Sequence, residues 1–278
     1  MKSVSAFTGL VEFGPRFRSN PAISHVLFDF DGTLSLIREG WVQVMVPMFV
    51  EMLPPLPGET EEERRRICQE DILGLNGKQT IYQMMRLASR ISERGGRAQE
   101  PLYYKHEYLR RLEDRVVPRV AALRAGKAFP DDYLVYGSRQ LLDTLSHRGF
   151  VLYLASGTDE RYVKEEAQLL GLSHYFGNHI YGALDDYKKF SKKMVIERIL
   201  KENAIPGGRL LSFGDGYVEI QNTKEAGGTA VAVASNEAHN GSGLFDEWKR
   251  NRLLGVGADV VVPDYRDAEA LINLILES

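Results

Sequence analysis

The stretch His25-Val26-Leu27-Phe28-Asp29-Phe30-Asp31-Gly32-Thr33 decides the fold of this chain. A run of strand-favouring apolar residues leads into two aspartates one residue apart, followed by a glycine and a hydroxyl. Successive side chains of a strand alternate between faces, so Asp29 and Asp31 point the same way if the strand continues. Two carboxylates at the end of a buried strand repel each other and favour a bound cation, and Mg²⁺ prefers oxygen ligands. The alternative is a solvated turn, for which Asp and Gly are ordinary residues.

The composition is that of a globular protein with one large domain or two modest ones. The chain has 278 residues, of which 44% are hydrophobic and 26% charged, and its net charge is −3. Such a charge gives no general attraction to nucleic acid or membrane. The single cysteine, Cys68, excludes an intrachain disulfide and fits a reducing compartment. Residues 1–10 lack the apolar centre of a signal peptide, and no apolar run approaches the roughly 18 residues of a membrane span. We therefore expect a cytoplasmic protein.

Residues 35–127 predict a helical block without strands. Pro47 is expected to kink or restart its first helix, and Pro118 to bend or break its last long one. Methionine-rich stripes in this block are typical of packing. The expected helices cover about 41–52, 59–66, 81–88 and 108–123.

Strands and helices alternate from residue 129 to the end. This order predicts an α/β fold with a doubly wound parallel sheet and right-handed crossovers. Ser138 is expected to cap the first helix of this part, and residues 1–24 predict either a small hairpin or a loose arm. The expected strands are 25–30, 151–155, a short one near 180, 210–213, 230–234 and 260–262. The expected helices are 138–149, 161–170, 192–201, one ending near 226, and 268–275.

Other polar groups follow the ends of the neighbouring strands, where ligands of such sheets bind. Ser156-Gly157-Thr158 follows one strand and offers a hydroxyl and free amides to an anion, although such a turn is also a common helix cap. Gly214-Asp215-Gly216 follows another, with Glu219 one helical turn later. Four lysines lie between these two stretches, at 188, 189, 192 and 193. One of them could reach an anion bound at the strand ends.

Together these residues resemble the four signatures of the haloacid dehalogenase superfamily of phosphohydrolases. The resemblance covers about 25–34 and 128–278: Asp29 to Thr33 resembles the first signature, Ser156 the second, and Asp215 with Glu219 the fourth. Lys192 resembles the third, because apolar residues follow it at the usual offsets; Lys193 is the second choice, and Lys188 or Lys189 are weaker ones.

The resemblance implies a two-domain organisation. It predicts a Rossmann-like core of residues 1–34 and 128–278 and an inserted helical cap of residues 35–127, as in relatives of phosphoglycolate phosphatase and β-phosphoglucomutase. Residues 35–127 resemble the family's cap in two respects: their position between the first and second signatures, and their helical content.

The resemblance also implies roles for individual residues. Asp29 is the expected nucleophile, Asp31 the general acid and base, and Ser156 and Lys192 bind phosphoryl oxygens. The implied Mg²⁺ ligands are Asp29, Asp31 through its backbone carbonyl, and Asp215, with Glu219 acting through water or as a support of Asp215. The residues expected around the substrate are Gly32, Thr33, Gly157 and Thr158 and, from a polar turn between cap helices, Asn76 and Lys78.

We therefore expect an Mg²⁺-dependent phosphatase that hydrolyses a small phosphorylated metabolite through an aspartyl phosphate. A sugar phosphomutase and a non-catalytic binding protein with the same fold are the alternatives. A dehalogenase is disfavoured because its reaction has no use for an acid at Asp31. We expect no nucleic-acid or membrane partner, and either a monomer or a homodimer.

Overall fold

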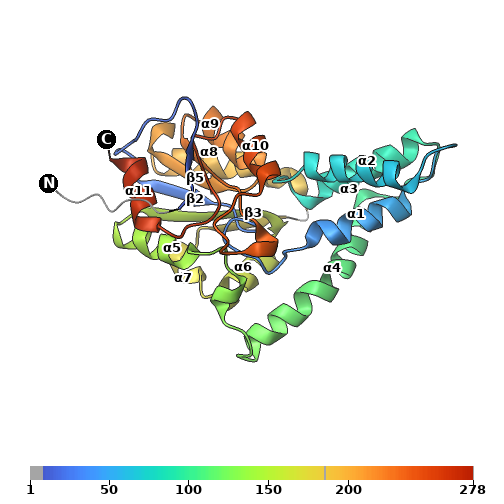
Figure 1. The fold of residues 1–278 in the computed structure, drawn as a ribbon, viewed down its shortest axis with the longest axis horizontal. Helices are drawn as coiled ribbons and strands as arrows, with labels where there is room; N and C mark the ends of the chain where they lie inside the picture. The colour runs from blue at the N-terminus through green and yellow to red at the C-terminus, as the bar shows by residue number, and fades with distance from the viewer. Residues whose placement is uncertain (1–8, 185, 278) are drawn as a thin grey trace.

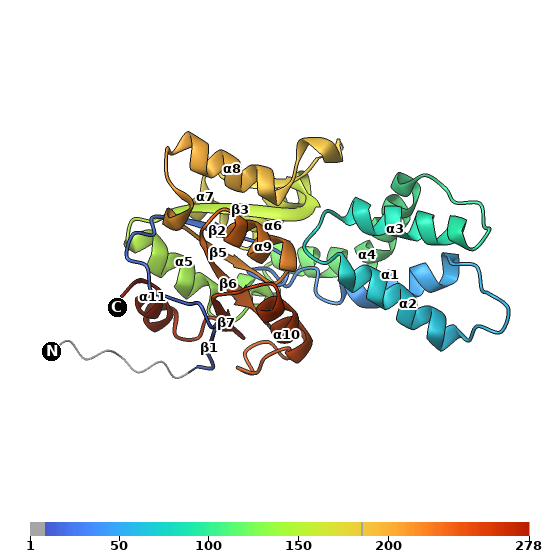
Figure 2. The same ribbon diagram turned by 90° about the horizontal axis from the view of Figure 1, so that it is seen from above.

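A computed structural model describes residues 9–184 and 186–277 (Figures 1 and 2). Within these residues lies a seven-stranded sheet with the strand order β1-β7-β6-β5-β2-β3-β4. All neighbouring strands pair in parallel except β1, which runs antiparallel to β7 at the edge. The doubly wound, mostly parallel sheet is thereby confirmed. The strands are β1 (Glu12–Phe13), β2 (His25–Phe28), β3 (Val151–Asp159), β4 (Ile180–Ala183), β5 (Leu210–Gly214), β6 (Thr229–Val233) and β7 (Val260–Val262).

Helices cover both faces of the sheet because both faces are apolar. Val26 and Phe28 of β2 face one layer, whereas Leu27 faces the other, as alternation requires. The layer on the Val26 side consists of α5 (Ser138–His147), α6 (Glu160–Leu169), α7 (Ser173–Phe176) and α11 (Ala268–Leu276). The opposite layer consists of α8 (Lys192–Glu202), α9 (Tyr217–Glu225) and α10 (Glu247–Gly255).

Strand β2 occupies the position at which the strand order reverses. It pairs with β3 on one side and β5 on the other. The chain adds β3 and β4 on one side of β2 and then returns to add β5, β6 and β7 on the other side. A crevice forms outside the carboxyl ends of the strands at such a point, and ligands of open α/β sheets bind there. The carboxyl end of β2 is where Asp29 and Asp31 follow.

Four helices inserted after β2 form a separate layer to one side of the sheet (Figure 1). They enclose their own apolar cluster, which includes Met48, Phe49 and Met84. This arrangement supports the predicted core (1–34 and 128–278) and cap (35–127), a division that stays a prediction. The four helices are α1 (Trp41–Met52), α2 (Glu61–Gly74), α3 (Thr80–Glu93) and α4 (Pro101–Arg124).

The structure decides part of what was expected at two prolines and corrects one helix cap. Helices α1 and α4 continue through Pro47 and Pro118, so neither proline ends its helix, and a kink or bend there stays a prediction. A proline removes one backbone hydrogen bond, which the packing of a long helix can offset. Ser138 does not cap α5; the cap residue is Gly137, which has a φ of 81°. A side chain there would collide with the backbone of Tyr265, so the chain needs a glycine.

Helices α7 and α10 and strand β1 have no counterpart among the expectations. Helix α10 was not predicted, because its charged sequence Glu247-Trp-Lys-Arg-Asn-Arg has little apolar periodicity. Residues 1–24 were expected to form a small hairpin or a loose arm. In the structure, residues 12–13 form β1, which adds an edge strand to the sheet. Residues 1–8 lie outside the described part of the chain. Within the described residues, we find no helix of the length and apolar character that a membrane crossing requires.

Candidate active site

Asp29 lies buried directly after β2, and its side chain is paired with a lysine. Its backbone amide donates to the carbonyl of Phe213 at 2.9 Å, which continues the pairing of β2 with β5. The carboxylate Oδ1 lies 2.8 Å from Nζ of Lys192. Burial is the main cause that raises the pKa of Asp29 to about 7; Lys192 opposes this rise, and the negative charges of Asp215 and Asp31 contribute to it. The acidic neighbours therefore add to the cost of a charge on this carboxylate.

Asp31 is held by two hydroxyls from the end of β3. Ser156 Oγ and Thr158 Oγ1 donate to its Oδ2, at 3.0 and 2.9 Å. The other oxygen, Oδ1, is buried and accepts no hydrogen bond from any residue in the described ranges, while Nε of Arg38 lies 3.9 Å from it. A buried carboxylate oxygen without a donor is costly in the absence of a ligand. Oδ1 is thus available for a proton or for a ligand hydroxyl.

Lys192 is the lysine that the fold brings to Asp29. It is the first residue of α8, and Ser191 caps the helix by accepting a hydrogen bond from the amide of Met194 at 3.1 Å. Its ammonium also contacts Glu219, on α9. Lys193, in contrast, is exposed and lies 3.6 Å from Glu225. Lys188 and Lys189 are exposed as well.

Asp215 follows β5 and completes the acidic side of the site. It lies against the segment that follows Asp31, because a Cβ added at Gly32 would be 2.4 Å from Oδ2 of Asp215. Asp29 and Asp215 are both buried, and the charge of Asp215 is close enough to raise the pKa of Asp29. Their hard oxygen donors suit Mg²⁺.

The other predicted metal ligands have different contacts. Glu219 faces Lys192, and the side chain of Asp31 is occupied by Ser156 and Thr158. Accordingly, no group of three acidic, histidine or cysteine side chains in residues 9–184 and 186–277 is arranged to hold a metal ion. The side-chain donors for a metal would be Asp29 and Asp215, and further donors would have to be backbone carbonyls or water.

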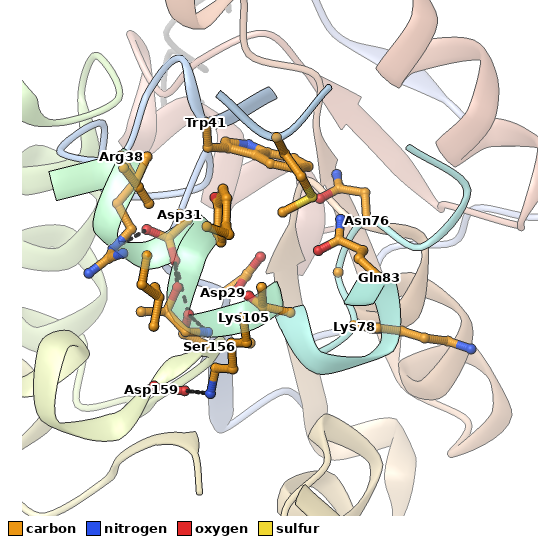
Figure 3. Close-up of a pocket in the computed structure, with 18 of the residues that line it drawn as sticks. Asp29, Asp31, Arg38, Trp41, Asn76, Lys78, Gln83, Lys105, Ser156 and Asp159 are labelled. Atoms are coloured by element: carbon orange, nitrogen blue, oxygen red, sulfur yellow. Dashed lines mark hydrogen bonds and ion pairs between the residues drawn. The ribbon is translucent and has the colours of Figure 1, made fainter. Parts of the chain in front are cut away.

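A cavity of about 80 Å³ brings the predicted residues of the core together with residues of the cap (Figure 3). Gly32, Thr33 and Glu219 do not line it. The side chain of Lys78 is directed away from it (Figure 3), and its ammonium lies 5.7 Å from the ring centre of Tyr82. The predicted residues that line it are Asp29, Asp31, Ser156, Gly157, Thr158, Lys192, Asp215, Asn76 and Lys78.

Two cationic side chains of the cavity were missed in the sequence. Arg38 donates to Glu166 at 2.6 Å, and Lys105 of α4 lies 2.5 Å from Asp159. Lys105 stands one helical turn before Tyr108 in the apolar stripe of α4, and a charge in such a stripe is a signal that could have been noticed. No comparable feature of the sequence around Arg38 points to a role in the site. Gly77, which belongs to the predicted polar turn, also lines the cavity. The other lining residues that were not predicted are Trp41, Met45, Thr80, Gln83, Tyr108, Leu109, Leu112 and Asp159.

The turn between α2 and α3 closes the cavity by docking against loops of the core. A Cβ at Gly157 would be 2.7 Å from the carbonyl oxygen of Lys78, and one at Gly216 would be 2.7 Å from Cα of Gly77. Gln79 is buried, and its Nε2 donates to the carbonyl of Phe190 at 2.7 Å, two residues before Lys192. Glycines at both contacts let the two backbones approach closely.

Several solved structures share the fold of this chain. A predicted phosphoglycolate phosphatase from Haemophilus somnus has 14% identity and a TM-score of 0.57, over 88% of this chain and 96% of that chain. β-Phosphoglucomutase from Clostridium difficile has 14% identity and a TM-score of 0.55, over 88% and 92%. CbbY from Rhodobacter sphaeroides, in complex with phosphate, has 19% identity and a TM-score of 0.56, over 91% and 100%. At such identities the likeness shows a shared fold.

The family is shown by the sequence itself. A search of curated protein sequences finds no match. The family model of haloacid dehalogenase-like hydrolases, however, matches residues 23–227, which include all the strand-end residues described above. The chain therefore belongs to the haloacid dehalogenase-like hydrolase family.

Proposed function

We propose that this hydrolase is an Mg²⁺-dependent phosphatase that removes the phosphoryl group of a small metabolite through an aspartyl phosphate. The observation that carries the proposal is the meeting of Asp29, Asp31, Ser156 and Lys192 in one cavity, although they lie far apart in the sequence. The set contains a nucleophile, an acid and two groups that can bind phosphoryl oxygens. Each is fixed by a core contact, as efficient positioning requires.

In the first step, Asp29 forms a bond to phosphorus while the bond from phosphorus to the leaving oxygen breaks. The leaving oxygen carries the electron pair away and takes a proton from Asp31, whose Oδ1 has no hydrogen-bond donor among the described residues. Ser156 and Lys192 donate to the phosphoryl oxygens. Lys192, which neutralises Asp29 at rest, thereby also offsets the charge that makes a phosphate monoester resist attack.

In the second step, Asp31 accepts a proton from water, which attacks phosphorus. The bond between phosphorus and Asp29 breaks, and inorganic phosphate is released. Mg²⁺, when bound by Asp29, Asp215 and the backbone carbonyl of Asp31, supplies positive charge that lowers the repulsion between the carboxylates and the phosphoryl group.

The size of the cavity favours a small substrate. Its volume of about 80 Å³ lies well below the roughly 300–1,000 Å³ of pockets that bind drug-sized ligands. Beyond the strand ends it is bounded by helices α1, α3 and α4, so selectivity among phosphate esters would come from the proposed cap of residues 35–127.

A screen of phosphorylated metabolites for phosphate release, with Mg²⁺ and with excess chelator, tests the proposal. We expect sustained release from one or more small monoesters, only with Mg²⁺, and no release by Asp29→Asn. The matched control is Asp259→Asn, because Asp259 is also buried and paired with a lysine, Lys224, but lies outside the cavity. Release unchanged in Asp29→Asn would overturn the proposed nucleophile.

The same screen separates the alternatives. A sugar phosphomutase would interconvert two phosphate esters and would need a bisphosphate primer instead of releasing phosphate steadily. A non-catalytic binding protein would retain a metabolite or phosphate without turning it over. Either result would replace the phosphatase proposal.

A further inference from the structure

Lys249 is a second buried lysine of the strand-end site, and none of the steps above uses it. It lies on α10, in the same helix layer as α8, which carries Lys192, and it is 8% exposed. Its Nζ lies 2.9 Å from Oδ2 of Asp215 and 2.5 Å from Oε1 of Glu237. A buried ammonium with two carboxylate partners is costly to assemble, so its position calls for an explanation.

The contacts of Lys249 connect three strand ends. Besides Asp215 after β5, its Nζ lies 3.4 Å from Oγ of Ser235, shortly after β6. Ser235 in turn donates to the backbone carbonyl of Gly32, after β2, at 2.8 Å. The lysine thus belongs to a hydrogen-bonded network that ends on the loop carrying Asp31.

Asp215 lies between two cavities of the molecule. Its side chain borders the 80 Å³ cavity and also a second cavity of about 740 Å³, lined by Glu237, Trp248 and Arg252 among others. In the described part of the chain, the Asp215 carboxylate has one hydrogen-bonding or ionic partner, Lys249, which holds Oδ2. The other oxygen is left free for a ligand.

We propose that Lys249 is a positioning residue for the metal site: it fixes the Asp215 carboxylate so that one oxygen remains directed to a divalent cation shared with Asp29, and Glu237 orients Lys249. This inference rests on the proposed function, because it assigns Asp215 to the metal. Two lysines then flank the acidic pair, Lys192 on Asp29 and Lys249 on Asp215. Without Lys249, Asp215 and Glu237 repel each other and Asp215 turns away from Asp29.

Direct binding of Mn²⁺ to the full-length protein, followed by electron paramagnetic resonance without substrate, tests this role. We expect Lys249→Met to raise the dissociation constant for Mn²⁺ about 10–100-fold, the range known for groups that orient a metal ligand. Lys249→Arg should recover part of the affinity, and Glu237→Gln should weaken binding less than Lys249→Met. Turnover of Lys249→Met should recover largely at saturating Mg²⁺, since the reacting groups are intact.

Lys224→Met is the matched control, because Lys224 also pairs with an acid of the core, Asp259, outside both cavities. It should bind Mn²⁺ like the wild type. Unchanged or tighter binding in Lys249→Met would overturn the inference. If Lys249→Met does not fold, unchanged or tighter Mn²⁺ binding in both Lys249→Arg and Glu237→Gln would overturn the inference instead.

The outcomes for the wild type keep the two proposals apart. A wild type that binds no Mn²⁺ would overturn both the metal dependence and the role of Lys249. A wild type that binds Mn²⁺ with the predicted loss in Lys249→Met, but hydrolyses no phosphate ester, would overturn the phosphatase alone.

Discussion

The two ends of the cavity are built in different ways. At the core end, the polar groups are tied to partners within the core: Asp31 to Ser156 and Thr158, and Lys192 to Asp29. At the cap end, the lining mixes apolar and polar side chains from three helices, and Lys105 is tied across the boundary to Asp159 of the core. The core end is therefore fixed whether or not the cap is docked, whereas the cap end is complete only when it is docked. The chemistry would reside in the first and the choice of substrate in the second.

The largest effect is expected at the core end, from Asp31→Asn. Removing the proton donor should slow the first turnover by about 10²–10⁴-fold for an alkyl phosphate, whose leaving oxygen needs a proton. It should matter far less for p-nitrophenyl phosphate, whose leaving group is stable as an anion. Rapid-quench measurements of the first turnover compare the two substrates. An equal loss for both would contradict the assignment of Asp31 as an acid and would leave it a role in the architecture of the site.

Lys192→Met tests the other fixed group of the core end. Loss of its positive charge should reduce turnover by about 10²–10³-fold. It also leaves Asp29 and Glu219 buried without a cation, which should lower the free energy of unfolding by about 3–5 kcal/mol. Urea denaturation and kcat measure the two effects.

Lys193→Met is the natural comparison for Lys192→Met, because Lys193 is the exposed neighbour in sequence. It should change stability by less than about 0.5 kcal/mol and leave turnover intact. The double variant Lys192→Met/Glu219→Gln should regain part of the stability but none of the turnover. If Lys193→Met were the inactive variant, the site would have been assigned to the wrong lysine.

The same contrast between the two ends explains what the sequence could predict. Asp29 and Asp215 directly follow β2 and β5, Asp31 comes three residues after β2, and Ser156 lies near the end of β3. Local sequence and the geometry of parallel sheets were therefore enough to bring these residues together. The contact of Lys105 with Asp159 depends instead on how α4 docks on the core, which no local pattern encodes. Lys249 escaped notice for a similar reason: its helix has weak periodicity, and its contacts come from residues that follow two different strands, β5 and β6.

A smaller effect is expected where the two ends meet, from Gly157→Ala. The new Cβ would lie 2.7 Å from the carbonyl oxygen of Lys78, so the turn between α2 and α3 would have to move away. A displacement of about 1 Å can reduce activity by about 10²-fold, so we expect a loss of about 10–100-fold in kcat/KM for the best substrate. The loss should be smaller for a minimal phosphate ester that makes few contacts with the cap. Gly208→Ala is the control, because no atom lies within 4 Å of its added Cβ.

The smallest effect, with no change in activity, is expected inside the cap, where Cys68 reports on the cap alone. The thiol is buried in the apolar cluster of α1–α4, and burial, with a lesser effect of Asp71, raises its pKa from 9.0 to about 11. Two pKa units reduce the thiolate at pH 8 about 100-fold, so the folded protein should react with a thiol reagent at least that much more slowly than the unfolded chain. Between pH 9 and 11 the unfolded thiol loses its proton before the folded one does, so the wild type should lose stability relative to Cys68→Ala as the pH rises.

Thiol reactivity measured against urea concentration then gives the stability of the cap, and circular dichroism gives that of the whole chain. If the thiol becomes exposed at a lower urea concentration than the main transition seen by circular dichroism, the cap unfolds by itself. If the two transitions coincide, the cap and the core unfold as one cooperative unit. In that case docking on the core stabilises the cap more than its own cluster of apolar residues does.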